Sequence, residues 1–144
     1  MDLRPARPSE AALLSELALR SKAHWGYDPE FLELCRPVLT LRPGEVEPRR
    51  TVVADAGGQI QGFYTLDDGE LGNLWIDPDH LRQGVGRSLW NHAVEAARAL
   101  GLTELLIVAD PHAEGFYRAM GAVRTGEVPS EVEPGRRLPQ LRAR

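Results

Sequence analysis

The segment Glu70–Ala109 constrains the fold of this 144-residue chain more than any other. It begins as a strand that ends before Pro78, continues as a helix from about Gly84 to Leu100, and finishes in the apolar run Leu105–Ala109. A continuous apolar run is typical of a strand buried on both faces. The segment therefore predicts a right-handed crossover between two parallel strands.

The helix of this segment has a single apolar stripe, which predicts that one face packs on a sheet. The stripe consists of Val85, Leu89, Ala93, Ala96, Ala97 and Leu100. Gly101 follows directly and supplies a C-terminal stop.

Three strands joined by tight turns are expected before the helix. Thr51–Ala54 and Ile60–Leu66 flank the turn at Gly57–Gly58, and Glu70–Asp77 follows the turn at Asp67–Gly69. Glycine and aspartate pairs at such positions are typical of hairpins, so these strands form an antiparallel meander.

The N-terminal part of the chain reads as two helices. Apolar residues at helical spacing mark the first, Ser21–Tyr27 reads as a loop, and Asp28 followed by Pro29 gives a good start for the second. Pro37 should end or kink that second helix.

The C-terminal part reads as a short helix over Ala113–Met120 and a strand over Ala122–Thr125. Arg137–Arg142 is expected as an exposed edge strand, where Pro139 is tolerable. We expect one α/β (mixed α+β) domain over residues 1–144, with a mixed central sheet flanked by helices. An exposed C-terminal edge would allow a homodimer.

Composition excludes several classes of protein. The formal net charge of −4 argues against a dedicated nucleic-acid binder, and no apolar run is long enough to cross a bilayer. The single cysteine, Cys35, excludes an internal disulfide and fits a cytoplasmic location; in its helical stripe it reads as a small core residue. The spacing of the histidines and the cysteine predicts no metal site.

The junction between the third strand and the long helix contains Gly84-Val85-Gly86. Backbone N–H groups at a helix start have no intrahelical partner, and the helix dipole adds partial positive charge there. The two glycines leave room for an anion, while Arg82, Arg87 and the Ser88 hydroxyl add further donors. This chemistry suits a diphosphate.

Other readings of this turn are less consistent with the chain. A turn that merely connects two elements does not need a buried strand on either side of the helix. A dinucleotide fingerprint requires a third glycine where Leu89 stands, although Glu104 lies near the distance expected for a ribose-binding acid. A Walker loop would require Gly-Lys-Ser/Thr, which the chain lacks.

The strand, Pro78, Gly84-Val85-Gly86 and the amphipathic helix resemble the acetyl-CoA motif of the GNAT superfamily of N-acetyltransferases, usually written Arg/Gln-x-x-Gly-x-Gly/Ala. The segment Asp110–Ala122 is similar to the later stretch in which these enzymes commonly read Asn-x-x-Ala-x-x-Phe-Tyr-x-x-x-Gly-Phe. The chain departs from the pattern at Leu81, Asp110 and Ala122. Asp110 is the most awkward departure, since a carboxylate cannot supply the amide donor of asparagine.

The resemblance implies acetyl-CoA as cosubstrate and transfer of its acetyl group to an amine by direct attack in a ternary complex. It implies that the backbone of Leu74–Ile76 splays from the next strand and offers amides to the pantetheine arm and the thioester. The expected cofactor contacts are Leu74, Trp75, Ile76, Arg82, Gln83, Gly84, Val85, Gly86, Arg87, Ser88, Asp110 and Phe116.

Two catalytic residues follow from the resemblance. An amine with a pKa of roughly 10 must lose a proton before it attacks, and Glu70 matches a position often used as general base in the family. A solvated turn carboxylate is an equally good reading of Glu70, and water relayed by Asp68 or Asp77 is a further one. Tyr117 matches the general acid that protonates the leaving thiolate. An aromatic at this place could equally belong to the core, but Phe116 next to it already serves that purpose, which favours Tyr117 as the acid.

The acceptor pocket in such enzymes is usually built by the first two helices and their connection, which here carries His24, Trp25 and Tyr27. Trp25 and Tyr27 would form an apolar wall with polar tips, and His24 would orient or deprotonate the amine. As alternatives, Trp25 anchors the loop and His24 is solvated. Arg136-Arg137 reads most simply as a solvated pair, although it could reach an acidic acceptor. The sequence leaves the small-molecule or peptide acceptor unidentified, and a silent acyl-CoA-binding regulator is the alternative function.

Overall fold

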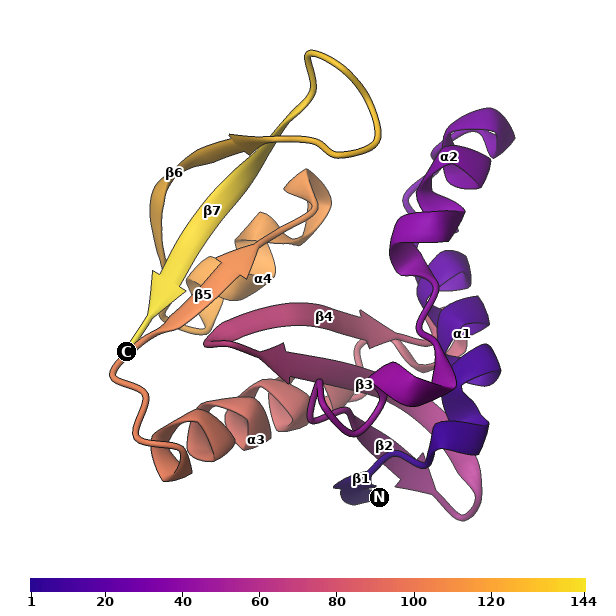
Figure 1. Cartoon of the computed structure of the whole chain (residues 1–144), viewed down its shortest axis with the longest axis vertical. Coiled ribbons are helices and arrows are strands. Elements are labelled where there is room, and N and C mark those ends of the chain that lie inside the picture. The colour runs from indigo at the N-terminus through magenta and orange to yellow at the C-terminus, as the bar shows by residue number, and fades with distance from the viewer.

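The computed structural model describes residues 1–144 and places seven strands in one sheet of order β1-β2-β3-β4-β5-β7-β6 (Figure 1). The strands are β1 (Asp2–Pro5), β2 (Val52–Ala56), β3 (Gln59–Asp67), β4 (Glu70–Ile76), β5 (Leu105–Val108), β6 (Val123–Pro129) and β7 (Arg137–Ala143). The α-helices are α1 (Ala11–Ala23), α2 (Pro29–Leu39), α3 (Val85–Ala99) and α4 (Glu114–Ala119). The expected mixed α/β domain, meander and crossover are confirmed.

The sheet is antiparallel except between β4 and β5. These two strands pair in parallel only at Glu70 with Leu106 and at Leu71 with Ile107. Beyond Leu71 the strands separate, and Figure 1 shows the sheet opening in a V between β4 and β5. The β5-facing edge of β4 is therefore unpaired from Gly72 onward.

The expected edge strand over Arg137–Arg142 is wrong in its position, because β7 lies between β5 and β6. The edges of the sheet are β1 and β6. Pro139 is tolerated inside the sheet because it faces the end of β5, where its carbonyl accepts a hydrogen bond from the Ala109 amide at 3.0 Å. Its missing N–H thus costs no central ladder bond.

Successive residues of the central strands feed two cores, one on each face of the sheet. Val52 and Tyr64 pack with α3 and α4, whereas Val53 and Phe63 pack with α1. The α3 stripe is buried as expected at Val85, Leu89, Ala93 and Ala97, but Leu100 lies beyond the helix and is 44% exposed. No helix is both long enough and apolar enough to span a membrane.

The connection between the first two helices is shorter than the sequence indicated. Ser21 and Lys22 are buried residues of α1, so the loop begins only at His24. The start of α2 is as expected, since the Asp28 side chain accepts a hydrogen bond from the Phe31 amide at 2.8 Å. Pro37 lies in the last turns of α2, which ends at Leu39.

Candidate active site

A cavity of about 630 Å³ lies where β4 leaves β5. It is lined from both halves of the sheet, from α1 and α2, and from the loop between β6 and β7. A volume of this size is in the range of small-molecule sites. The strand that forms one wall is irregular, and this irregularity decides which side chains enter.

A bulge in β4 sets that wall. Thr65 pairs with Asn73 while the next residue of β3, Leu66, pairs with Leu71, so Gly72 is the extra residue. The bulge brings Glu70, Asn73 and Trp75 to the cavity, and leaves Leu71 in the core under α3. A regular strand would have put Glu70 and Asn73 on opposite faces.

Glu70 lies at the acidic end of the cavity and is half-buried. Burial raises its pKa above the ordinary 4.5, and the neighbouring carboxylates of Asp67 and Glu131 raise it further. Asp67, Asp68 and Glu131 all line the same cavity. A carboxylate with a raised pKa is a stronger base than one in water, so the surroundings of Glu70 suit proton abstraction.

The turn before α3 offers a row of unused backbone donors. The first hydrogen bond of the helix runs from the Ser88 amide to the Gly84 carbonyl at 3.1 Å. No backbone hydrogen bond outside the helices and strands uses the amides of residues 83–87. Gly84 has φ +82° and Arg82 has φ +62°, so the turn is in the left-handed region at both positions.

Glycine is required at positions 84 and 86 of the turn for two different structural reasons. Gly84 adopts a positive φ with open space around it, as expected for a turn that an anion approaches. Gly86 instead faces Phe116, since a Cβ there would lie 3.2 Å from the Phe116 ring. Both glycines were expected to make room for an anion. Gly86 in addition allows α3 to pack against α4. Phe116 thereby supports the turn.

Charged side chains at this turn have no partner in the chain. Arg82 and Arg87 are exposed and take part in none of the ion pairs of the structure, while Gln83 contacts His80 Nδ1 at 3.3 Å. Two guanidinium groups beside unused amides make a site of positive potential. The turn can therefore hold a diphosphate.

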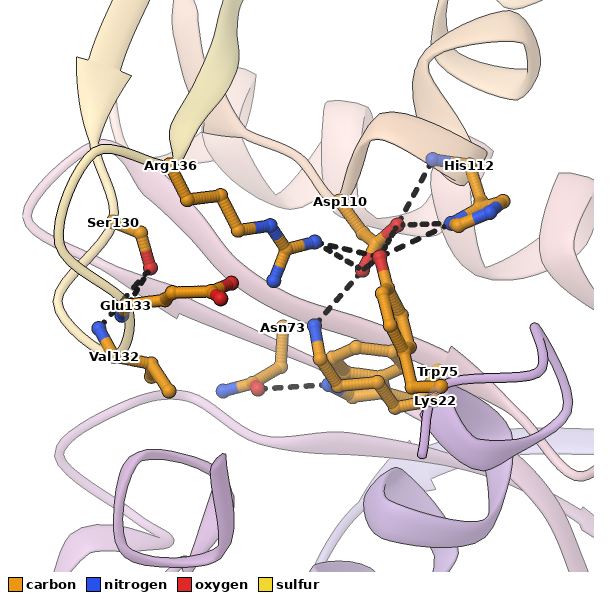
Figure 2. Close-up of polar contacts among 10 residues, drawn as sticks. Lys22, Asn73, Trp75, Asp110, His112, Ser130, Val132, Glu133 and Arg136 are labelled. Atoms are coloured by element: carbon orange, nitrogen blue, oxygen red, sulfur yellow. Dashed lines mark hydrogen bonds and ion pairs between the residues drawn. The ribbon is translucent and has the colours of Figure 1, made fainter. Parts of the chain in front are cut away.

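Asp110, which stands where the family pattern has asparagine, is the centre of a buried network (Figure 2). Its carboxylate accepts hydrogen bonds from Lys22 Nζ at 2.8 Å, Tyr27 Oη at 2.9 Å and the His112 amide at 2.9 Å. Although burial opposes ionisation, these donors prevail and lower the pKa of Asp110 to about 2. Both oxygens are engaged inside the protein, so its expected cofactor contact stays a prediction.

Arg136 belongs to the same network, contrary to its reading as part of a solvated pair. Its side chain is only 17% exposed, lies over the rings of Tyr27 and Phe31, and donates to Tyr27 Oη at 2.6 Å. Arg137 does point to solvent, where it pairs with Glu127 at 2.7 Å. The network joins α1, the α1–α2 loop, the end of β5 and the β6–β7 loop.

Tyr117 is buried in the core between α3 and α4. Its ring centroid lies 5.8 Å from that of Trp90 and 5.3 Å from that of Phe116. Burial raises the pKa of its hydroxyl, which keeps the group protonated but makes it a weaker acid than a tyrosine in water. Its role as general acid stays a prediction.

The expected acceptor residues lie beside the cavity, and none of the three is among its lining residues. Trp25 is 41% exposed and stacks on the His112 ring at 5.2 Å, with His24 edge-on to it at 5.7 Å. Tyr27 reaches the cavity only through its hydrogen bonds to Asp110 and Arg136. Their role as acceptor contacts stays a prediction.

Lys22, Asn73 and Arg136 line the cavity. Lys22 and Asn73 were not identified as site residues from the sequence, and Arg136 was considered only as an alternative contact for an acidic acceptor. One signal was available. A carboxylate in place of the usual asparagine, at the end of a buried strand, requires a buried cation nearby. Nothing local indicated that this cation is Lys22, which lies 88 residues away in the chain.

Comparisons with known proteins agree with this geometry. The acetyltransferase (GNAT) family model matches residues 14–122. The peptidyl-lysine N-acetyltransferase YjaB of Salmonella typhimurium is 40% identical over 72 residues, which are 50% of this chain and 47% of that protein. The chain therefore matches about half the length of this curated relative.

Two solved structures share the fold. A GCN5-related N-acetyltransferase from Rhodopseudomonas palustris superposes with a TM-score of 0.86 at 21% identity, over 98% of this chain and 93% of that one. The PaiA N-acetyltransferase of Thermoplasma acidophilum, solved in complex with coenzyme A, gives 0.79 at 16% identity, over 98% and 96%. At these identities the likeness concerns the fold alone.

Proposed function

The chain belongs to the acetyltransferase (GNAT) family, and from this premise we propose that it transfers the acetyl group of acetyl-CoA to an amine within a ternary complex. One observation carries the proposal most. The edge of β4 that loses its partner beyond Leu71 runs from the half-buried Glu70 toward the turn with unused amides. The proposed positions of the amine, the thioester and the diphosphate thus lie one after another along β4, from Glu70 to the turn before α3.

The cofactor would bind with its pyrophosphate on the amides of residues 83–87. Arg82 and Arg87 would neutralise its charge, since neither has an ion-pair partner in the chain. Relatives in the same fold class are consistent with this ligand, because the PaiA enzyme was solved with coenzyme A. The pantetheine arm would extend along the unpaired edge of Leu74–Ile76.

Chemistry at the thioester needs a base, an oxyanion donor and an acid. Glu70 would take a proton from the ammonium, directly or through one water, so that the free nitrogen attacks the acetyl carbonyl carbon. A backbone amide of β4 beyond Leu71 would stabilise the negative oxygen. The nitrogen, still positively charged after attack, would lose its second proton to water; the carbon–sulfur bond then breaks, and Tyr117 would give its proton to the thiolate.

Cys35 lines the cavity but is poorly suited to a covalent route. Its thiol is buried, and burial raises its pKa, so the nucleophilic thiolate is disfavoured. Direct attack by the amine is therefore the mechanism that the site favours.

The alternative is a regulator that binds acyl-CoA without turnover. Titration with acetyl-CoA, NADH and ATP tests the ligand, and only acetyl-CoA should bind at micromolar concentration. Release of free CoA across a panel of amines then separates enzyme from regulator. Tight binding of acetyl-CoA without release for any amine would favour the regulator, and equal binding of NADH or ATP would contradict the cofactor assignment.

A further inference from the structure

The cavity has a basic end, far along β4 from Glu70. Lys22 Nζ lies 5.9 Å from the centroid of the Trp75 ring, and Arg136 lies beside it. Because of the bulge, Glu70 and Trp75 lie opposite Asp67 and Phe63, which are four residues apart on β3, or roughly 13 Å at about 3.3 Å per residue. Most acidic and basic side chains of the cavity thus occupy different ends; the exception is Arg49, which lies 3.9 Å from Asp67 at the acidic end and also pairs with Glu45.

The basic end contains more positive than negative charge. Lys22 and Arg136 share one carboxylate, since Asp110 Oδ2 lies 2.8 Å from Lys22 Nζ and 3.7 Å from Arg136 Nη2. The His112 ring also contacts Asp110, at 3.0 Å. With side chains only 11% and 17% exposed, Lys22 and Arg136 leave a partly buried surplus of one positive charge.

Both cations have hydrogen-bond donors to spare. The Arg136 guanidinium donates from Nη2 to Tyr27 Oη, while Nε and Nη1 donate to no group of the chain. Lys22 makes one hydrogen bond with an ammonium that can donate three. Because both side chains line the cavity, these free donors are available to a ligand inside it.

One exposed carboxylate faces the basic end of the cavity without forming an ion pair with its cations. Figure 2 shows Glu133 pointing from the β6–β7 loop toward Arg136, yet the two form no ion pair. Glu133 is exposed, unlike Asp110. A ligand carboxylate could take the place toward which Glu133 points.

We propose that the acceptor is an amine that also carries a carboxylate, which Lys22 and Arg136 bind while the amine lies toward Glu70. This inference rests on the proposed acetyl transfer and specifies its substrate. A planar guanidinium beside an ammonium matches the two oxygens of a carboxylate. The acids at the other end, Asp67, Asp68, Glu70 and Glu131, attract the cationic nitrogen before it is deprotonated.

Matched pairs of ligands test the proposal on the CoA-saturated protein. Glycine, β-alanine, 4-aminobutyrate and 6-aminohexanoate are each compared with their carboxamides, which lack the negative charge. A lysine peptide with a neighbouring glutamate and its glutamine counterpart form a second arm, which distinguishes a protein acceptor from a free amino acid. Binding to the CoA-saturated protein is followed by the Nε–H resonance of Arg136. Turnover is measured separately with acetyl-CoA, by release of CoA.

At least one acid should bind about tenfold or more tightly than its amide, as expected for charge-assisted hydrogen bonds, and should shift the Arg136 resonance. Arg136→Gln should abolish this preference, whereas Arg137→Gln, the matched change on a solvated arginine, should retain it. Glu133→Gln should increase it, because a competing carboxylate is removed. These variants are compared only when their thermal unfolding matches that of the wild type.

Binding of every acid no more tightly than its amide would overturn the proposal, and so would an undiminished preference in Arg136→Gln. Failure of acetyl transfer would look different. In that case acids would still bind in preference to amides and shift Arg136, but no amine would release CoA.

Discussion

At the residue scale, the proposed chemistry depends on Glu70 and on the environment that the bulge at Gly72 gives it. The bulge turns Glu70 into the cavity beside Asp67, and burial together with this charge raises its pKa. A sequence motif identified the position, but not these neighbours. The choice between base and solvated carboxylate could not be made from the sequence, because it depends on burial.

Glu70→Gln should lower kcat by about a hundredfold, the usual contribution of a general base. Because the base acts when deprotonated, wild-type kcat/KM should fall with acidification at a pH above 4.5, the ordinary glutamate value. The variant should lose this acid limb. The measurement is a pH–rate profile of CoA release.

Asp67→Asn is the matched control for Glu70. It removes a charge that raises the Glu70 pKa, so the acid limb should move to lower pH but persist, unlike in Glu70→Gln. An unchanged profile in Glu70→Gln would exclude Glu70 as the base and favour a water relay.

Tyr117→Phe should bind acetyl-CoA as the wild type does and turn over about a hundredfold more slowly, since only the proton donor is removed. The ring and its packing on Trp90 are retained, so stability should change little. Isothermal titration and steady-state rates on one preparation check both parts. Full turnover in this variant would assign Tyr117 to the core alone.

At the element scale, the meander, the crossover and the start of α2 could be predicted, because periodicity, turns and capping are local signals. The place of β7 between β5 and β6 could not, because strand order depends on pairing between distant segments. The same holds for the network at Asp110, whose members come from four separate parts of the chain.

Asp110→Asn should destabilise the protein by about 3 kcal/mol, although asparagine is the usual residue of the family pattern, because two cations lose their buried partner. Chemical denaturation measures the free energy of unfolding. Glu127→Gln, which removes an exposed carboxylate partner of Arg124 and Arg137, is the control and should cost little. Equal losses in both variants would contradict the network's importance.

The ionisation of Asp110 also makes the free energy of unfolding depend on pH. The folded pKa of Asp110, about 2, lies below its ordinary 3.8. Its stabilisation is therefore complete above about pH 3.8 and is lost as the pH falls toward 2.

Lys22→Met combined with Asp110→Asn should recover part of the stability lost in Asp110→Asn alone, since one unpaired buried charge is removed.

At the scale of the whole molecule, the site exists because the sheet is joined through only two parallel residue pairs. One half of the sheet brings Glu70 and the unpaired edge of β4, and the other brings Asp110 and the β6–β7 loop (Figure 1). The diphosphate turn lies at the start of α3, after β4. Separation of the two halves thus creates both the edge of β4 proposed for the cofactor and the cavity proposed for the acceptor.

Direct transfer of acetyl from acetyl-CoA to an amine, where β4 separates from β5, is the reaction proposed for this protein. The most direct test is mass spectrometry after incubation with carbon-13-labelled acetyl-CoA, with and without an amine panel that includes amino acids. Direct transfer predicts labelled amine with one CoA released per acetyl group, and no label on the protein when the amine is left out. Absence of label from every amine, or labelled Cys35 without amine, would contradict it.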